Sequence, residues 1–302
     1  MTGQTASAPI GVTAAAPSGP WRKISKLITG YPLIPVFILL VMLVCGLFAP
    51  WIAPRDPIRP NVIAQSTPPA WYEKGSSDYL LGSDHLGRDM LSRLVYGARV
   101  SLLVVVISTT SGMAVGTLLG LMAGYFGGNV DELISRIVDI WLAIPFLLVA
   151  LIIVIVLGQS FPLMLALLAL LAWSPFVRNV RAEVLSLRER DYVSNARIAG
   201  AGAVRIMWRH ILPNVLNTIM VIASLRVGQL ILSESILSFL GVGVPPPTPA
   251  WGAMVSDGRN YLNTAWWIST FPGFAILFVV MAFNFVGDWI RDKTDPRLRQ
   301  LG

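Results

Sequence analysis

Charged residues are scarce in this 302-residue sequence. Asp, Glu, Lys and Arg make up 13% of it, whereas 55% is hydrophobic and the mean hydropathy is +0.67. This composition excludes a water-soluble domain of this length and predicts a membrane protein. The net charge of +7 is compatible with a nucleic-acid binder, but the basic residues lie between apolar runs and form no single stripe. We therefore expect a lipid bilayer, and no nucleic acid, among its partners.

Groups that carry chemistry are also few. The single cysteine, Cys45, excludes an intrachain disulfide and a cysteine-based metal site within the chain. The two histidines, His85 and His210, are predicted on opposite sides of the membrane, so no nucleophile, base and orienting group can be assembled from them. The sequence has no G-x-x-x-x-G-K-[ST] motif to hold nucleotide phosphates. We expect no catalytic residue and no resident cofactor, which disfavours an integral-membrane enzyme.

One short segment, SDHLGRD, could suggest a metal site. Asp84, His85 and Asp89 are all residue types that bind metals, but no second cluster of such residues accompanies them. We favour a hydrogen-bonded loop here and predict no metal site.

Long apolar runs are what the sequence does contain. A helix needs about 20 mostly apolar residues to cross the hydrocarbon core, and six stretches come near that length. They are residues 32–53, 100–124, 140–158, 161–177, 215–237 and 266–287. Only Gln159 and Ser160 separate the third from the fourth, which predicts a tight helical hairpin. We predict an all-α, polytopic membrane protein with about six transmembrane helices.

The distribution of Lys and Arg predicts the orientation, because cytoplasmic loops carry an excess of both. The excess is obtained when both termini face the cytoplasm. Residues 54–99 then form a long external loop, and residues 178–213 form a cytoplasmic loop rich in arginine. Residues 1–20 are rich in Ala, Pro, Gly, Ser and Thr without periodicity, which predicts a disordered tail.

Glycine recurs every fourth residue in the second predicted span. The set is Gly112, Gly116, Gly120 and Gly124. On a helix these positions form a smooth ridge that another helix can approach closely. We favour packing within the chain over a subunit interface.

The cytoplasmic loop contains the stretch NARIAGAGAVRIMWRHILPN, residues 195–214. Apolar residues before and within it recur at helical spacing and predict one apolar face. They are Leu185, Tyr192, Ala196 and Ala199. Gly200 and Gly202 allow a sharp turn that residues with a Cβ would resist. A second short helix, about 203–211, then leads to Pro213, where we expect the chain to leave one helix and enter another. The pattern predicts a compact helix-turn-helix knob for a partner.

The spacing in this loop resembles the EAA loop of ABC importer permeases, written E-A-A, three residues, G, nine residues, I-x-L-P. The Gly, Leu and Pro places fall on Gly200, Leu212 and Pro213. Ala196 matches the third place of E-A-A, whereas Ser194, Asn195 and His210 depart from the pattern.

Four further segments resemble the C-type permease subunit of dipeptide and oligopeptide importers. They are LLGSDHLGRDMLSRLVYGARVSL (80–102), GYFGGNVDELISRIVDIWLAIPFLL (124–148), SESILSFLGVGVPPPTPAWGAMVSDGR (233–259) and FPGFAILFVVMAFNFVGDWIRDKTDPR (271–297). The likeness covers about residues 21–299. It implies that these residues form a permease domain with the type I ABC importer transmembrane fold, whose EAA loop is the coupling helix seated in a cleft of an ATPase.

The resemblance also implies partners in the cytoplasmic membrane. They are a homologous second permease subunit, two ATP-binding subunits that hold ATP and Mg, and an extracytoplasmic peptide-binding protein. The residues expected to couple to the ATPases are Ala196, Gly200, Gly202, Arg209, Leu212 and Pro213. ATP binding would move the docked knobs, and packed helices would convert that motion into opening on the other side of the membrane.

Two charged residues in the fifth span are candidates for a translocation path. Arg226 and Glu234 lie about 12 Å apart along a helix, too far for a direct ion pair. Charge within a span is costly and usually faces the protein interior or a wet cavity. The alternatives are partners on other helices or, for Glu234, snorkelling to the outer surface.

Other functions remain open at this point. Nickel importers use similar permeases, so nickel is the rival substrate to di- and oligopeptides. A self-sufficient channel or ion-driven carrier is a more distant rival, because it should show internal repeats or intramembrane ionisable clusters.

Overall fold

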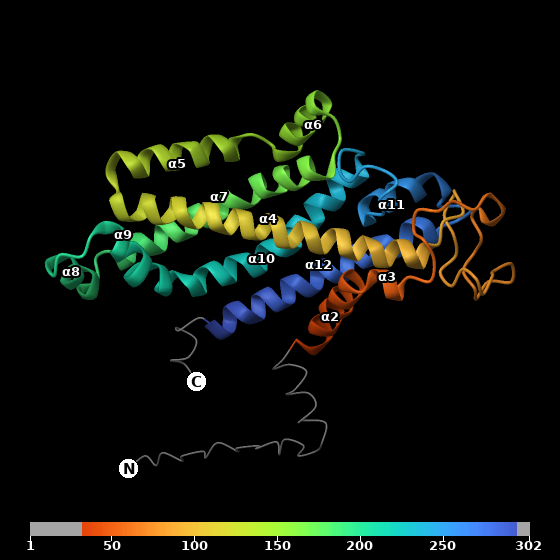
Figure 1. The fold of residues 1–302 in the computed structure, drawn as a ribbon, viewed down its shortest axis with the longest axis horizontal. Helices are drawn as coiled ribbons and strands as arrows, with labels where there is room; N and C mark the ends of the chain where they lie inside the picture. The colour runs from red at the N-terminus through yellow and green to blue at the C-terminus, as the bar shows by residue number, and fades with distance from the viewer. Residues whose placement is uncertain (1–31, 295–302) are drawn as a thin grey trace, which may run out of the picture.

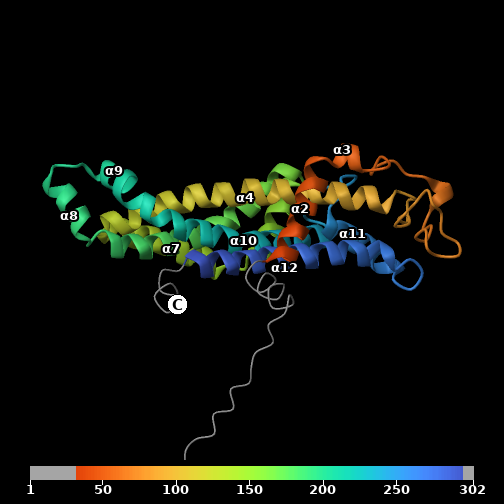
Figure 2. The ribbon, with the colours of Figure 1, turned by 90° about the horizontal axis from the view of Figure 1, so that it is seen from below.

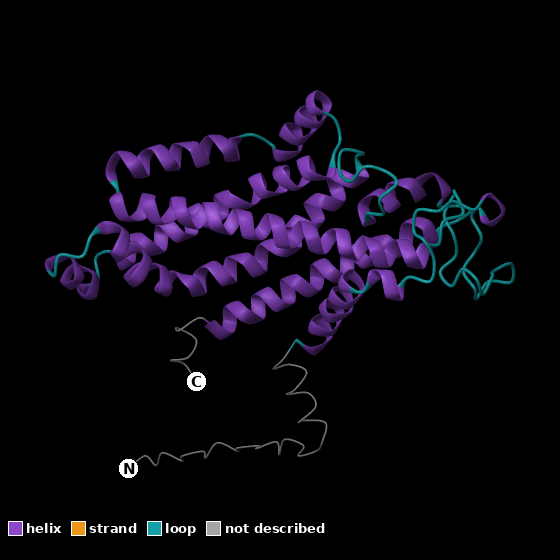
Figure 3. Cartoon of the chain, viewed as in Figure 1, coloured by secondary structure: helices purple, strands orange, loops and turns teal. Residues whose placement is uncertain are grey.

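The computed structural model describes residues 32–294. The predicted tail 1–20 and the ends of the predicted permease domain, 21–31 and 295–299, lie outside the described residues. Within the described part every regular element is a helix, and no strand is present (Figure 3). The predicted all-α fold class is therefore confirmed for these residues.

The elements follow one another in a simple order. They are α2 (Leu33–Leu47), α3 (Ala49–Ile52), the 3-10 turn η1 (Val62–Ala64), α4 (Met90–Phe126), α5 (Gly128–Ala143), α6 (Phe146–Leu157), α7 (Phe161–Leu187), α8 (Asp191–Ile198), α9 (Ala203–Ile206), the π-helical turn η2 (Met207–Ile211), α10 (Leu212–Phe239), α11 (Trp251–Gly258), the 3-10 turn η3 (Arg259–Tyr261) and α12 (Trp267–Thr294).

The long helices α4, α7, α10 and α12 run along one elongated bundle (Figures 1 and 2). The irregular segment of residues 53–89, which precedes α4, lies at one end of this bundle, and α8 and α9 lie at the other. The two segments that sequence patterns place on opposite sides of the membrane are thus separated by the full length of the bundle.

Four helical runs in residues 32–294 are long and apolar enough to cross a bilayer. They are Met90–Phe126, Phe161–Leu187, Ala203–Phe239 and Trp267–Lys293. With 37 residues, α4 is about 55 Å long, well beyond a hydrocarbon core of about 30 Å. It therefore begins ten residues before the predicted span 100–124, within the predicted external loop.

The third predicted span, 140–158, is not one straight helix. The chain bends by 81° between α5 and α6. Ile144 is extended, because the residue before a proline is disfavoured in helical conformation. Pro145 then stands at the start of α6. Gly158, at φ +80°, then ends α6, and the Ser160 hydroxyl accepts a hydrogen bond from the Leu163 N–H to begin α7. The predicted hairpin is thus formed by the short helix α6 and by α7, and the break between α5 and α6 precedes it.

The first predicted span, 32–53, is interrupted as well. Helix α2 ends at Leu47 after 15 residues, and the four-residue α3 follows with Pro50 in its first turn. At about 22 Å, α2 is shorter than the hydrocarbon core.

The glycine ridge of α4 faces α7. A Cβ built on Gly120 would lie 2.8 Å from the Val180 Cβ, and one on Gly124 would lie 2.6 Å from the Val184 Cβ. No side chain fits in that space, so the two backbones approach closely. Packing within the chain, the favoured interpretation of this ridge, is confirmed.

Candidate functional site

The candidate coupling residues lie in the segment from Asp191 to Pro213, which we call the elbow. It comprises α8, α9, η2 and the start of α10, and it forms one end of the molecule (Figures 1 and 2). Helix α8 ends in a hydrogen-bonded turn. The Ala201 N–H donates to the Ala196 carbonyl at 3.0 Å, and the Gly200 N–H donates to the Arg197 carbonyl at 3.1 Å. This pair of bonds is the Schellman arrangement, which requires a left-handed residue at Gly200.

The two glycines of the elbow have different roles. Gly200 has φ +81°, a conformation that costs residues with a Cβ about 1–2 kcal/mol. Gly202 has φ −69° and an extended ψ, which any residue adopts. A Cβ on either glycine would meet no atom within 4 Å. The turn therefore depends on Gly200 alone, and the predicted need for Gly202 is wrong for backbone conformation.

The elbow is fixed to the bundle by one apolar cluster. Val193 of α8 is fully buried, and Ala196, Ala201 and Leu212 are packed against the same cluster. The cluster also contains residues of three long helices: Leu121 of α4, Phe176, Val180 and Val184 of α7, and Val215, Ile219 and Ile222 of α10. The predicted apolar face of α8 is partly wrong, because Tyr192 and Ala199 are exposed. The buried side of this short helix is centred on Val193, one residue after the predicted Tyr192.

No helix break occurs at Pro213. The run from Ala203 to Phe239 is one helix, widened by the π-helical turn η2 just before α10. The Leu212 N–H donates to the Met207 carbonyl, five residues back. Pro213 is the second residue of α10, just after the π-helical turn, and has no N–H to donate back into that turn. The last part of the elbow is therefore continuous with α10, so a displacement of the elbow acts directly on that helix.

The outer surface of the elbow exposes apolar side chains. Ile198 is 85% exposed, Val204 67% and Trp208 57%. Arg205 and Arg209 are exposed beside them. Large apolar side chains exposed on an otherwise polar element are typical of an interaction surface. The sequence carries part of this signal, because Ile198, Val204 and Trp208 are large apolar residues in an otherwise polar and glycine-containing stretch.

A hydrogen bond, an ion pair and a cation–π contact connect the end of α7 and the elbow to α4 and α5. The Arg188 guanidinium donates to the Gly124 carbonyl at 3.0 Å, and that of Arg197 lies 6.0 Å from the Tyr125 ring centre. Arg181 of α7 donates from Nε and Nη2 to the two carboxylate oxygens of Asp131 on α5, the Nη2 bond at 2.7 Å. Asp131 lies in the first turn of α5, so this ion pair ties the start of α5 directly to α7.

The structure keeps Arg226 and Glu234 apart. Glu234 is fully buried and accepts a hydrogen bond from the Ser238 hydroxyl at 2.7 Å and from the Ser235 hydroxyl at 3.4 Å. Within residues 32–294 its hydrogen bonds come from hydroxyls of its own helix and it does not snorkel, so for these residues both alternatives are contradicted. Arg226 is partly exposed and donates to the Gln229 side chain.

The residues that suggested a metal site form a different structure. Asp84 is buried and binds Arg88 at 2.6 Å and Arg93 at 3.6 Å. Asp89 caps α4 by accepting from the Ser92 N–H at 2.8 Å, and His85 stacks on a tyrosine ring. Residues 32–294 contain no group of three possible metal ligands. The hydrogen-bonded loop favoured from the sequence is confirmed.

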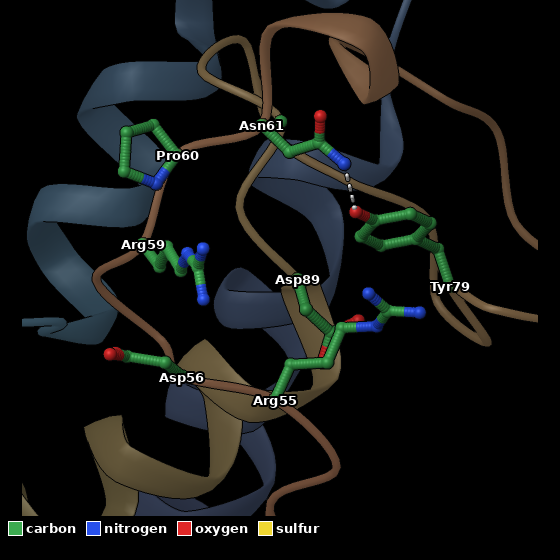
Figure 4. Close-up of a pocket in the computed structure, with 8 residues that line it drawn as sticks. Arg55, Asp56, Arg59, Pro60, Asn61, Tyr79 and Asp89 are labelled. Atoms are coloured by element: carbon green, nitrogen blue, oxygen red, sulfur yellow. Dashed lines mark hydrogen bonds between the residues drawn. The ribbon is translucent and has the colours of Figure 1, made fainter.

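A cavity of about 510 Å³ opens among residues 55–89, at the end of the bundle opposite the elbow. Figure 4 shows the side chains that line it. It is lined by Arg55, Asp56, Arg59, Pro60, Asn61, Tyr79, Gly87 and Asp89. The Asn61 amide donates to the Tyr79 hydroxyl at 3.0 Å, and the Arg55 guanidinium lies 4.6 Å from the Tyr79 ring centre. Both signs of charge line the cavity, so it suits polar contacts with another molecule.

Comparison with solved structures places the fold. A chain of the MetNI methionine ABC transporter, solved in inward-facing conformations, matches 68% of this chain and 98% of its own length. The TM-score is 0.55 at 20% sequence identity, so the likeness concerns the fold. The fold expected from the sequence, that of type I ABC importer transmembrane subunits, is thus confirmed.

Comparison of sequences identifies the family. The chain belongs to the binding-protein-dependent transport system inner membrane components, whose model matches residues 116–300. The di/tripeptide transport system permease protein DppC of Pseudomonas aeruginosa is 44% identical over 87% of both chains. The dipeptide transport system permease protein DppC of Escherichia coli K12 is 46% identical over 88% of both. The resemblance found in the sequence is thus confirmed, and the chain is a multi-pass inner membrane protein.

Proposed function

We propose that this chain is the permease subunit of an ATP-driven importer of di- and oligopeptides. The observation that carries the proposal is the 44–46% identity, over 87–88% of the chain, to permeases named for dipeptide or di/tripeptide transport. The length matched is nearly that of the whole relatives, so the likeness extends beyond the coupling element. Nickel, the rival substrate, is named in none of these relatives.

The proposed complex contains a homologous second permease, two ATP-binding subunits and an extracytoplasmic peptide-binding protein. ATP and Mg belong to the ATP-binding subunits in this proposal, and this chain binds no cofactor. Both termini and the elbow face the cytoplasm, whereas residues 54–89 face outward. The opposite positions of the elbow and residues 54–89 in the bundle support this assignment (Figure 1).

Coupling is proposed to pass through the elbow. Ile198, Val204 and Trp208 present the apolar surface that an ATP-binding subunit would cover, with Arg209 beside them. Ala196 and Leu212 pack inward, Gly200 fixes the turn, and Gly202 and Pro213 lie on the exposed side. Because the elbow shares one apolar cluster with α4, α7 and α10, its movement cannot leave those helices unchanged.

The path for peptide is proposed to include Arg226, whose partly exposed guanidinium could meet a peptide carboxylate. Glu234 is enclosed instead, so its part in the path would require a conformational change. Its hydroxyl partner Ser238 also accepts from the Val244 N–H at 3.3 Å, which ties Glu234 to the loop after α10.

Growth and uptake measurements test the substrate. In a strain without its own peptide and nickel importers, the complete complex should support growth on a dipeptide as sole nitrogen source. It should not raise nickel uptake. Nickel uptake without peptide-dependent growth would contradict the proposal, and transport by this chain reconstituted alone would contradict the need for ATP-binding partners.

A further inference from the structure

The cavity among residues 55–89 has a buried floor and an exposed mouth (Figure 4). Tyr79 and Asp89 form the floor, with 6% and 2% of their surface exposed, whereas Arg59 and Asn61 are exposed at the mouth. The volume of about 510 Å³ lies within the range of small-molecule sites, about 300–1,000 Å³. The cavity is therefore large enough to enclose a small molecule that enters past the exposed residues.

Hydrogen bonds within the chain hold the walls of this cavity in place. The Asn61 N–H donates to the Leu86 carbonyl at 3.0 Å, and the Asn61 amide donates to the Tyr79 hydroxyl at 3.0 Å. Gly87, at φ +75°, approaches the same segment so closely that a Cβ would clash with the Asn61 carbonyl oxygen. Asn61 thus joins two sides of the cavity, and the site is largely preformed, as ligand sites usually are.

One carboxylate oxygen in the floor has no hydrogen-bond donor. Asp89 Oδ2 accepts from the Ser92 N–H at 2.8 Å and from the Ser92 hydroxyl at 2.6 Å. The same hydroxyl accepts from the Arg55 N–H at 3.0 Å, so the orientation of the carboxylate is fixed. Asp89 Oδ1, by contrast, accepts no hydrogen bond from residues 32–294. A buried anionic oxygen without a donor is costly, because it has lost water without gaining a partner. A donor group in the cavity would remove that cost.

A positive charge in the cavity is unused as well. Arg59 makes no hydrogen bond or ion pair with another described residue, and its guanidinium points toward the middle of the labelled residues in Figure 4. Arg55, in contrast, is paired with Asp78 at 3.4 Å. The Asp56 carboxylate points away from the other labelled residues. The cavity therefore offers one free acceptor in its floor and one free guanidinium at its mouth.

We propose that this cavity binds a small zwitterion, whose ammonium group donates to Asp89 Oδ1 and whose carboxylate accepts from the Arg59 guanidinium. Hydrogen bonds between charged groups are the strong ones, so two of them can select such a molecule. The two termini of a short peptide carry this pair of charges. The choice of a dipeptide as the ligand rests on the proposed function, whereas the charge pairing does not. The site would hold peptide at the end of the bundle opposite the elbow.

Binding of radiolabelled diglycine to the purified complete complex, without the extracytoplasmic binding protein, tests this site. Asp89→Asn keeps an oxygen to cap α4 and replaces the free oxygen by an NH2 group, which cannot accept. This variant should bind diglycine about tenfold to a hundredfold more weakly, and so should Arg59→Gln. Asp56→Asn is the matched control and should bind normally, because its carboxylate points away. If the unaltered complex binds no diglycine, or if Asp89→Asn binds as the control does, the proposal is overturned.

Blocked dipeptides separate the two contacts from a damaged fold. Diglycine amide has no carboxylate, so Arg59→Gln should not weaken its binding further. N-acetyldiglycine has no ammonium group, so its weak binding should not respond to Asp89→Asn. Equal losses for all three probes in either variant would overturn the assignment of that contact.

Growth on a dipeptide measures the proposed function separately. Growth of the strain with the unaltered complex, together with unchanged diglycine binding in Asp89→Asn, would overturn only this site. Nickel uptake without growth would overturn only the proposed function.

Discussion

At one end of the bundle, polar side chains hold an irregular chain in place; at the other, an apolar cluster holds the elbow. Asp84 and Arg93 are buried together in the 53–89 region and the start of α4, and Asp257 of α11 contacts Arg93 at 3.8 Å. In the elbow, Val193 and Ile206 are buried, whereas Ile198 is almost fully exposed. Directional ion pairs resist displacement, while an apolar cluster can shift as one body. The first end is therefore a polar frame, and the second has the apolar attachment to the bundle that the proposed coupling requires.

The largest effect should come from breaking the polar frame. Asp84→Ala leaves Arg88 and Arg93 buried without this carboxylate, which should destabilise the fold by about 3–5 kcal/mol. Asp78→Ala removes an exposed ion pair with Arg55 and should cost less than about 1 kcal/mol. Thermal unfolding of the purified complex measures both. Similar melting temperatures for the two variants would contradict the buried frame.

The bundle between the two ends depends on the contact of α4 with α7. Gly120→Leu would force a side chain into Val180 and should cost about 1–3 kcal/mol. Ala114→Leu adds a similar side chain on an exposed part of α4 and serves as the control. Both variants are compared by the fraction of complex that survives heating. If Gly120→Leu is tolerated as well as Ala114→Leu, close packing of the ridge against α7 is contradicted.

The parts of this molecule differ in how far their structure could be predicted from the sequence. The ridge followed from a four-residue period, and the long helices followed from apolar runs, because each pattern is local. Pro145 is a local indication of the bend between α5 and α6, but the apolar run continues across it, so the prediction of one span over 140–158 was wrong there. The pairing of Asp131 with Arg181 joins residues distant in the sequence, and no local pattern could have predicted it. The buried face of α8 was missed by one residue, since an eight-residue helix carries too few turns to fix its phase.

Within the elbow, a smaller effect should separate the two glycines. Gly200→Ala should cost about 1–2 kcal/mol, because its backbone has φ +81°. Gly202→Ala should change the free energy of unfolding by less than that, since its backbone is extended. Protease sensitivity of the elbow is the appropriate measurement. Equal sensitivity in the two variants would mean that the turn does not rest on Gly200.

The smallest change in stability is expected at the exposed surface of the elbow. Ile198→Ser should leave the fold unchanged within about 0.5 kcal/mol. It should weaken attachment of the ATP-binding subunits by about tenfold if the side chain is central to that contact. Val130→Ser, on exposed α5, is the control. Binding of purified ATP-binding subunits to the permease pair provides the test, and undiminished binding to the Ile198→Ser variant would place the contact elsewhere.

Coupling through the elbow is tested most directly by measuring ATP hydrolysis and peptide uptake in the same proteoliposomes. We predict that the Gly200→Trp complex assembles with its partners and hydrolyses ATP but accumulates no peptide. Normal peptide uptake by that complex would contradict the account.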